Sequence, residues 1–263
     1  MLLHPEPAVG YNEVHSTPQY DAGPGKHRIG LITLSNDYVM ERDFMNMRMN
    51  MRSSDDLAIF TSRLLNTPDC TVETLQAMAP QISRAAALLI PEGRLDVVAY
   101  GCTSGTAVLG YDKVQSLIHS VRPGVQCVTP LTSSLAALDC FGANNIAVLT
   151  PYINEVNQKI ADCIETAGKS ISAFSSFKIT DNEQMANLAP ESILQAALDM
   201  DSTDADALFI SCTAIRAVDV IESIEQKLGK PVITAIQAMF WQSLRLSGCH
   251  QPVSGYGRLL KDW

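Results

Sequence analysis

The chain has 263 residues, of which 46% are hydrophobic and 18% are charged, and its formal net charge is −9. This length suits one large domain or two smaller ones, and an acidic chain without a Lys/Arg cluster is not a non-specific nucleic-acid binder. The apolar runs fall well short of the roughly 20 residues that a membrane helix needs. We therefore expect a soluble, cytoplasmic protein with no membrane or nucleic-acid partner.

The N-terminal residues 1–26 are rich in Pro and Gly and lack the basic start and apolar run of a signal peptide, which predicts an irregular arm. The seven cysteines are odd in number and contain no Cys-x-x-Cys pair, which favours reduced thiols. The five histidines show no metal-ligand spacing, so we expect no metal site.

Short apolar runs then alternate with helix-length segments along the rest of the chain. The runs predict strands at Arg28–Leu34, Leu57–Thr61, Asp96–Tyr100, Val125–Val128, Asn145–Thr150, Ser170–Ala173, Ala207–Ser211 and Pro231–Thr234. The segments between them predict helices that include Val72–Leu89, Leu135–Phe141, Glu155–Ala167, Ser192–Leu198, Ala217–Leu228 and Met239–Leu246. Because the strands are apolar throughout, this order predicts an α/β fold with parallel sheets covered on both faces.

Several short sequence motifs of the first part of the chain recur, in the same order, in the second part. Asp96 stands six residues before Cys102, and Asp206 stands six residues before Cys212. Two further strand segments repeat in the same sequence, which indicates two similar Rossmann-like (flavodoxin-like) halves. We expect the first half to comprise residues 27–129 plus 235–263, and the second to comprise residues 130–234.

Cys102 and Cys212 each follow the end of a predicted strand, where ligands bind in open parallel sheets. The hydroxyl and backbone N–H groups that follow them suit a carboxylate or an enolate oxygen, and we expect them to lower the pKa of each thiol. A cysteine is often only a small buried hydrophobe, which suffices for Cys127, Cys140 and Cys163. We assign no role to Cys70 and Cys249, which fall in loop-like stretches.

Two thiols at equivalent strand ends suit two reactions. In racemisation, one thiolate removes an α-proton and the opposing thiol delivers a proton to the other face. In cis-trans isomerisation, one thiolate adds to a double bond, the C–C bond rotates, and elimination follows. Neither reaction needs a cofactor. A two-lobed module that only binds an anion is the non-enzymatic alternative.

Further polar residues stand at the same strand ends, among them Asn36, Tyr152 and Asn182. With them the sequence resembles the aspartate/glutamate racemase superfamily, in particular the branch with maleate cis-trans isomerase, arylmalonate decarboxylase and the ectoine-utilisation protein EutA. Ser35-Asn36, Cys102, Pro151-Tyr152, Asp181-Asn182 and Cys212 fill the positions of the maleate isomerase pattern. The resemblance covers nearly all of residues 28–260. It implies two halves related by a pseudo-two-fold, an active site in the cleft between them, and a homo-oligomer.

The resemblance further implies roles for individual residues. Cys102 and Cys212 would be catalytic, and a small carboxylate would be bound by Asn36, Thr103, Ser104, Tyr152, Asn182, Thr213 and Ala214. The second half is more similar to arylmalonate decarboxylase, which has glycine at the position of Cys102. We therefore expect a cofactor-independent isomerase most like maleate cis-trans isomerase. The alternatives are an Asp/Glu-type racemase of the EutA-like group and, third, a decarboxylase.

Overall fold

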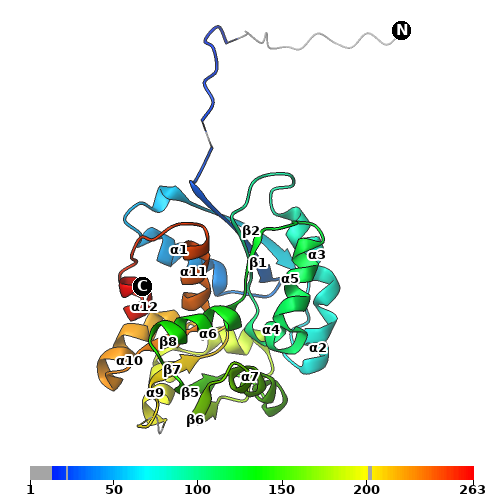
Figure 1. Ribbon diagram of the computed structural model, residues 1–263. Coiled ribbons are helices and arrows are strands. Elements are labelled where there is room, and N and C mark those ends of the chain that lie inside the picture. The colour runs from blue at the N-terminus through cyan, green and yellow to red at the C-terminus, as the bar shows by residue number, and fades with distance from the viewer. Residues whose placement is uncertain (1–13, 22, 201–202) are drawn as a thin grey trace.

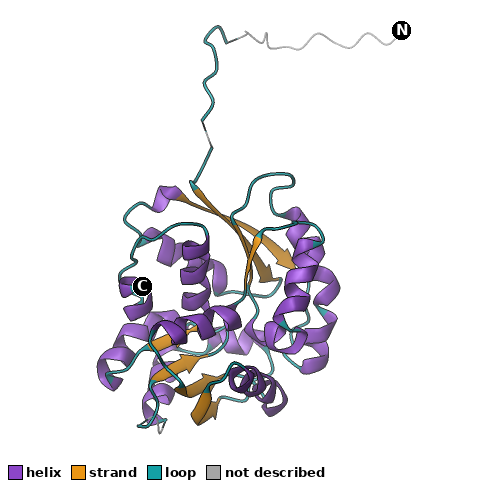
Figure 2. Ribbon diagram, viewed as in Figure 1, coloured by secondary structure: helices purple, strands orange, loops and turns teal. Residues whose placement is uncertain are grey.

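The computed structural model describes residues 14–21, 23–200 and 203–263, which fold into two four-stranded parallel sheets flanked by helices (Figures 1 and 2). The first sheet has the order β2-β1-β3-β4, formed by β1 (His27–Leu34), β2 (Leu57–Leu64), β3 (Val97–Tyr100) and β4 (Gln126–Val128). The second has the order β6-β5-β7-β8, formed by β5 (Asn145–Thr150), β6 (Ser170–Ser176), β7 (Ala207–Ile210) and β8 (Val232–Thr234). The second order repeats the first, so the predicted fold of two similar α/β halves is confirmed.

Each predicted strand is present, but two of them are longer than predicted. β2 and β6 continue to Leu64 and Ser176, because each pairs along the full length of the central strand beside it, up to Leu34↔Leu64 and Thr150↔Ser176. Both are edge strands, and the residues beyond the predicted ends include polar ones, Ser62-Arg63 in β2 and Ser175-Ser176 in β6. The apolar pattern therefore ends before the strand does.

Helices cover both faces of the first sheet. On one face lie α3 (Ala79–Leu88) and α5 (Tyr111–His119), and on the other lie α1 (Met40–Met49) and α11 (Ala235–Leu246) (Figure 1). Phe44 of α1 and Phe240 of α11 meet edge to face, with ring centroids 5.2 Å apart. The single helix predicted over Val72–Leu89 is wrong: α2 (Val72–Ala77) ends before α3, because Pro80 lacks the N–H that would continue it.

The second sheet is covered by helices that include α6 (Pro130–Cys140), α7 (Asn154–Thr166), α9 (Pro190–Asp199) and α10 (Ile221–Leu228). The predicted helix Ala217–Leu228 starts instead as a 3₁₀ turn, η2 (Ala217–Val220). α6 packs against α11 between the two sheets (Figure 1). The remaining elements are α4 (Thr103–Leu109), α8 (Asn182–Asn187), α12 (Gly257–Asp262) and a short 3₁₀ turn, η1 (Ser54–Asp56).

The repeated aspartates perform the same task in both halves. The Asp96 carboxylate accepts the backbone N–H of Arg28 at 2.7 Å, at the start of β1. The Asp206 carboxylate accepts the backbone N–H of Asn145 at 2.9 Å, at the start of β5. Each aspartate thus fixes the central strand of its sheet beside the strand that leads to a cysteine.

Part of the C-terminal segment returns to the first half, whereas α12 contacts α10 and β8 of the second. Met51 and Val253 form an isolated antiparallel bridge, in addition to the contact of α11 with α1. These contacts support our proposal that residues 235–263 belong with the first half. Residues 14–21 and 23–26 lead to β1 without helix or strand, and the other residues of the predicted arm lie outside the described residues (Figure 1). No helix in the described part of the chain is long and apolar enough to span a bilayer.

Candidate active site

Cys102 and Cys212 line the same cavity, although they belong to different halves. Cys102 follows β3 and Cys212 follows β7, the equivalent strand of the second sheet, and the two residues are only 3% and 4% exposed. The cavity is small, with a volume of about 20 Å³, which is room for about one water molecule. The carboxyl ends of β3 and β7 therefore present both thiols to one small space.

Most of the other predicted binding residues line this cavity as well. They are Ser104, Tyr152, Asn182, Thr213 and Ala214. Asn36 and Thr103 lie beside the cavity rather than in its wall. The Asn36 side chain accepts a hydrogen bond from Asn66 Nδ2 at 2.8 Å, and Asn66 does line the cavity. Asn36 is thus one residue removed from the space that a ligand would occupy.

The segment between β2 and α2, residues 65–71, forms a wall of the cavity that was not predicted. It supplies Asn66, Thr67, Asp69 and Cys70 to the lining. It also bonds across to the second half, since Cys70 N–H donates to the Thr180 carbonyl at 2.8 Å and Asn182 N–H donates to the Pro68 carbonyl at 3.0 Å. The segment follows a strand end, which is the same signal that located the two catalytic candidates.

Neutral donors surround the Cys102 sulfur. Its Sγ accepts the backbone N–H of Gly105 at 3.2 Å and lies 3.6 Å from Ser104 Oγ, which is in turn 3.5 Å from Cys70 Sγ. Gly105 has to be glycine, because a Cβ there would lie 2.9 Å from Cys102 Sγ and 2.5 Å from the Tyr100 hydroxyl. The start of α4 is therefore packed directly against the thiol.

Cys212 occupies a more strained turn. Its φ is +121°, a conformation that a non-glycine residue adopts rarely and at a cost of about 1–3 kcal/mol. Its Sγ accepts the backbone N–H of Ala214 at 3.2 Å. No regular helix follows at once, because η2 begins only at Ala217. A helix therefore begins directly after Cys102 but not after Cys212.

The prediction that these surroundings lower the pKa of the thiols is also wrong. Burial raises the pKa of Cys212 to about 12, although the Tyr152 hydroxyl and the Ala214 N–H act in the opposite direction. Burial likewise raises the pKa of Cys102, against the effect of Ser104 and Gly105. Removing the thiols from water outweighs the few donors that face them. Burial therefore favours the neutral thiol form of both sulfurs.

The two thiols also raise each other's cost of ionisation. A thiolate at Cys102 disfavours a second one at Cys212 by charge repulsion. None of the described residues that line the cavity is Lys, Arg or His. The site therefore favours at most one thiolate at a time, and neutral donors must stabilise it.

Comparison with known proteins assigns the chain to a family. The sequence model of the arylmalonate decarboxylase family matches residues 55–260. The chain belongs to this family. A maleate isomerase from Nocardia farcinica is 27% identical over 249 residues, which cover 90% of this chain and 97% of that protein. The arylmalonate decarboxylase of Bordetella bronchiseptica is 30% identical over 142 residues, which cover 53% of this chain and 59% of that protein.

A solved structure agrees in fold. A cysteine-to-serine mutant of the N. farcinica maleate cis-trans isomerase, with a covalently bound succinylcysteine intermediate, matches with a TM-score of 0.83 at 23% identity. The match covers 90% of this chain and 99% of that chain. The family match and the curated relatives confirm the predicted branch, with maleate isomerases and arylmalonate decarboxylase among the relatives of this chain.

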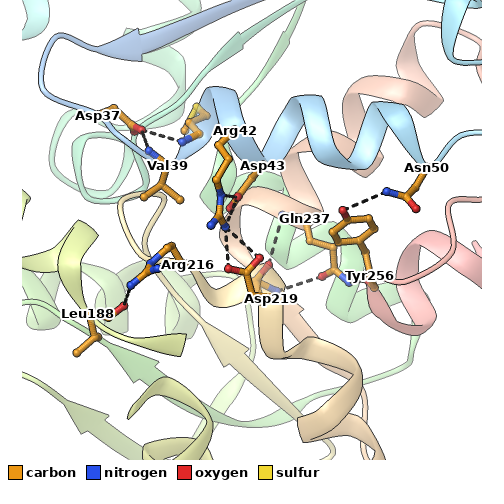
Figure 3. A network of polar contacts seen from close by, with 12 residues as sticks. Asp37, Val39, Arg42, Asp43, Asn50, Leu188, Arg216, Asp219, Gln237 and Tyr256 are labelled. Atoms are coloured by element: carbon orange, nitrogen blue, oxygen red, sulfur yellow. Dashed lines mark hydrogen bonds and ion pairs between the residues drawn. The ribbon is translucent and has the colours of Figure 1, made fainter. Parts of the chain in front are cut away.

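In this member of the arylmalonate decarboxylase family, a polar network ties α1 of the first half to the chain around η2 of the second (Figure 3). Arg42 of α1 donates to both carboxylate oxygens of Asp219 in η2, at 2.9 and 3.0 Å, and also to Asp43. Arg216 donates to the Leu188 carbonyl at 3.1 Å. The network fixes the chain that follows Cys212 against α1.

A second contact crosses between the halves nearer to the thiols. The Thr213 hydroxyl donates to the Gly101 carbonyl at 3.1 Å, and these two residues are direct neighbours of Cys212 and Cys102 in the chain. A substitution that displaces one thiol turn therefore acts on the other as well.

Proposed function

We propose that this protein is a cofactor-independent cis-trans isomerase that acts on a small unsaturated dicarboxylate such as maleate. The observation that carries the proposal is the convergence of Cys102 and Cys212 on one small cavity. Maleate isomerases of similar length support it, because the N. farcinica relative is matched over 97% of its own sequence. The succinylcysteine in the solved N. farcinica mutant supports a covalent route through a cysteine.

The reaction needs one thiolate and one thiol. The thiolate adds to one alkene carbon, and the electron pair passes to the neighbouring carbon, which takes the proton of the opposing thiol. The resulting succinyl thioether has a C–C single bond that rotates freely. The opposing thiolate then removes the proton, the C–S bond breaks, and the double bond re-forms in the trans geometry. Both sulfurs return to their starting state.

Neutral groups would bind the two carboxylates. The cavity offers the side chains of Ser104, Tyr152, Asn182 and Thr213. Hydroxyl and amide donors suit a carboxylate, and they also stabilise the negative charge that develops on the substrate during addition. Asn36 would act indirectly, since its amide oxygen holds Asn66 in place at the cavity.

Incubation with maleate and detection of fumarate by NMR tests the proposal. Cys102→Ser and Cys212→Ser should each abolish turnover, whereas Cys140→Ser, which changes a partly exposed cysteine outside the cavity lining, should retain it. Mass spectrometry of each inactive mutant after exposure to maleate identifies the cysteine that forms the adduct. Full activity in either mutant of the cavity would contradict a two-thiol mechanism.

The same protein sample distinguishes the alternatives. Deuterium incorporated at the α-carbon of aspartate, with loss of optical rotation, would identify a racemase instead. Release of carbon dioxide from an arylmalonate would identify a decarboxylase, and binding of maleate without turnover would identify an anion-binding module. Our proposal includes a cytoplasmic homo-oligomer, which light scattering tests for mass and fractionation tests for location.

A further inference from the structure

Tyr100 carries a buried hydroxyl group that has no hydrogen-bond partner among the described residues. The side chain is 0% exposed at the carboxyl end of β3, two residues before Cys102. An unpaired hydroxyl in a protein interior destabilises the folded state, whereas a phenylalanine would fill the same space without that cost. The presence of the hydroxyl therefore requires a reason other than packing.

The hydroxyl lies beside the Cys102 sulfur. A Cβ placed on Gly105 would be 2.5 Å from the Tyr100 oxygen and 2.9 Å from Cys102 Sγ, so both atoms border the same point of α4. Each group also influences the ionisation of the other: Tyr100 lowers the pKa of Cys102, and Cys102 raises that of Tyr100. The oxygen and the sulfur are thus near neighbours in the buried interior.

We propose that Tyr100 is a positioning residue whose hydroxyl donates a hydrogen bond to the thiolate form of Cys102. A neutral thiol is a weak acceptor, which explains why the hydroxyl is unpaired in the resting site. A thiolate is charged and accepts strongly, so the bond forms when the proton leaves Cys102. The inference rests on the proposed function only in requiring that Cys102 ionises at some stage.

The other groups around Cys102 explain why such a donor is needed. Asp37, in the loop after β1, disfavours a negative charge on the sulfur when its own carboxylate is ionised. Cys70 and Cys212 would do the same as thiolates. Against these, Ser104 and the Gly105 N–H are the remaining donors near the sulfur. Tyr100 adds a third donor to a thiolate that has no cation in its cavity wall.

The second half contains a matching arrangement. Tyr152 is 1% exposed, and its hydroxyl lowers the pKa of Cys212. The two tyrosines come from different places in the chain, Tyr100 from within β3 and Tyr152 from the turn after β5. Each thiol therefore has its own buried phenol that favours the thiolate form.

Tyr100→Phe tests the proposal without substrate. The measurement is the rate of iodoacetamide alkylation of each cysteine between pH 6 and 10, followed by mass spectrometry, together with the thermal unfolding midpoint. We expect Cys102 to react about tenfold more slowly at each pH below its pKa, the effect of a pKa raised by about one unit. Cys212, which opens on the same cavity, should keep its rate. The unfolding midpoint should be unchanged or higher, because an unpaired buried hydroxyl is removed.

Tyr111→Phe is the matched control. Its hydroxyl donates to the Cys127 carbonyl at 3.1 Å, away from the cavity, so its loss should lower the unfolding midpoint and leave Cys102 unaffected. An unchanged pH profile of Cys102 in Tyr100→Phe would overturn the proposal, whatever happens to stability. Because no turnover is measured, this outcome is independent of whether maleate is the substrate.

Discussion

Gly105 is the position at which a single added methyl group should disable the site. The methyl of Gly105→Ala would lie 2.5 Å from the Tyr100 hydroxyl, 2.9 Å from Cys102 Sγ and 3.1 Å from Met78 Cε. Non-bonded heavy atoms normally approach to about 3.5–4.0 Å. The hydroxyl and the sulfur would therefore each have to move by roughly 1 Å to avoid the new atom.

The effect on stability should be modest because two contributions oppose each other. Forcing a methyl into a packed interior typically costs about 1–3 kcal/mol. Replacing glycine by alanine inside a helix returns about 0.5–1 kcal/mol of that cost. We expect a net loss of about 1 kcal/mol in the free energy of unfolding of Gly105→Ala. A reactive atom displaced by roughly 1 Å can lose a factor of about 100 in rate, so activity should suffer far more than stability.

Urea unfolding, the alkylation rate of Cys102 and the turnover of maleate measure these effects separately. Ala107→Gly is a suitable control, because it lies in the same helix, outside the cavity lining, and should lose about 1 kcal/mol through helix propensity alone. The control should keep the alkylation rate of Cys102. If Gly105→Ala matches the wild type in both stability and alkylation, the close packing of α4 against the thiol is refuted.

Two further predictions concern Asp43 and Cys70. Burial raises the pKa of Asp43 from 3.8 to about 7, so the folded state binds a proton that the unfolded state releases, and stability should fall as pH rises between these values. Between pH 5 and pH 8 this loss is at most about 3 kcal/mol in the wild type, and urea unfolding of Asp43→Asn should lack it; an equal pH dependence in both proteins would contradict it. Cys70→Ala should change turnover and Cys102 alkylation by about threefold or less, since its thiol makes only a weak contact with Ser104. A larger loss would place Cys70 in the chemistry.

The fold could be predicted because the same signals occur in both halves. Buried parallel strands are continuous apolar runs, and helices separate them, so the strands appear in the sequence as a series of short apolar peaks. The aspartates at positions 96 and 206 marked the repeat, although their bonds to the neighbouring strand became visible only in the structure. Where polar ends or a proline broke the pattern, as at Ser176 and Pro80, the predicted boundaries were wrong.

The repeat located the two cysteines, and the family resemblance located the other predicted residues of the cavity wall, which are Ser104, Tyr152, Asn182, Thr213 and Ala214. Cys102 and Cys212 stand at equivalent strand ends, and both line the cavity. Cys70 has no counterpart in the second half, and it reaches the cavity through bonds between the halves that local sequence does not encode. The sequence analysis predicted lowered pKa values for the two thiols, whereas the structure raises them, and this error also comes from tertiary structure that local sequence does not encode. Burial depends on how the whole molecule closes around a side chain, whereas the N–H donors can be read from a strand-to-helix turn.

The two thiols have similar hydrogen-bond donors but differ in the backbone that holds them, and this difference bears on the proposed reaction. Each accepts one backbone N–H and has one phenol beside it, so a small free-energy difference decides which sulfur carries the charge. Their repulsion keeps the second sulfur protonated.

Cys102 is held at the start of a regular helix, whereas Cys212 sits in a strained turn. A sulfur that bonds to carbon needs a fixed direction of attack, while a proton carrier tolerates small movements. On this reasoning we propose that Cys102 forms the covalent adduct and Cys212 carries the proton. Cys212→Ser should then trap an adduct on Cys102, and the reverse mutant should trap none.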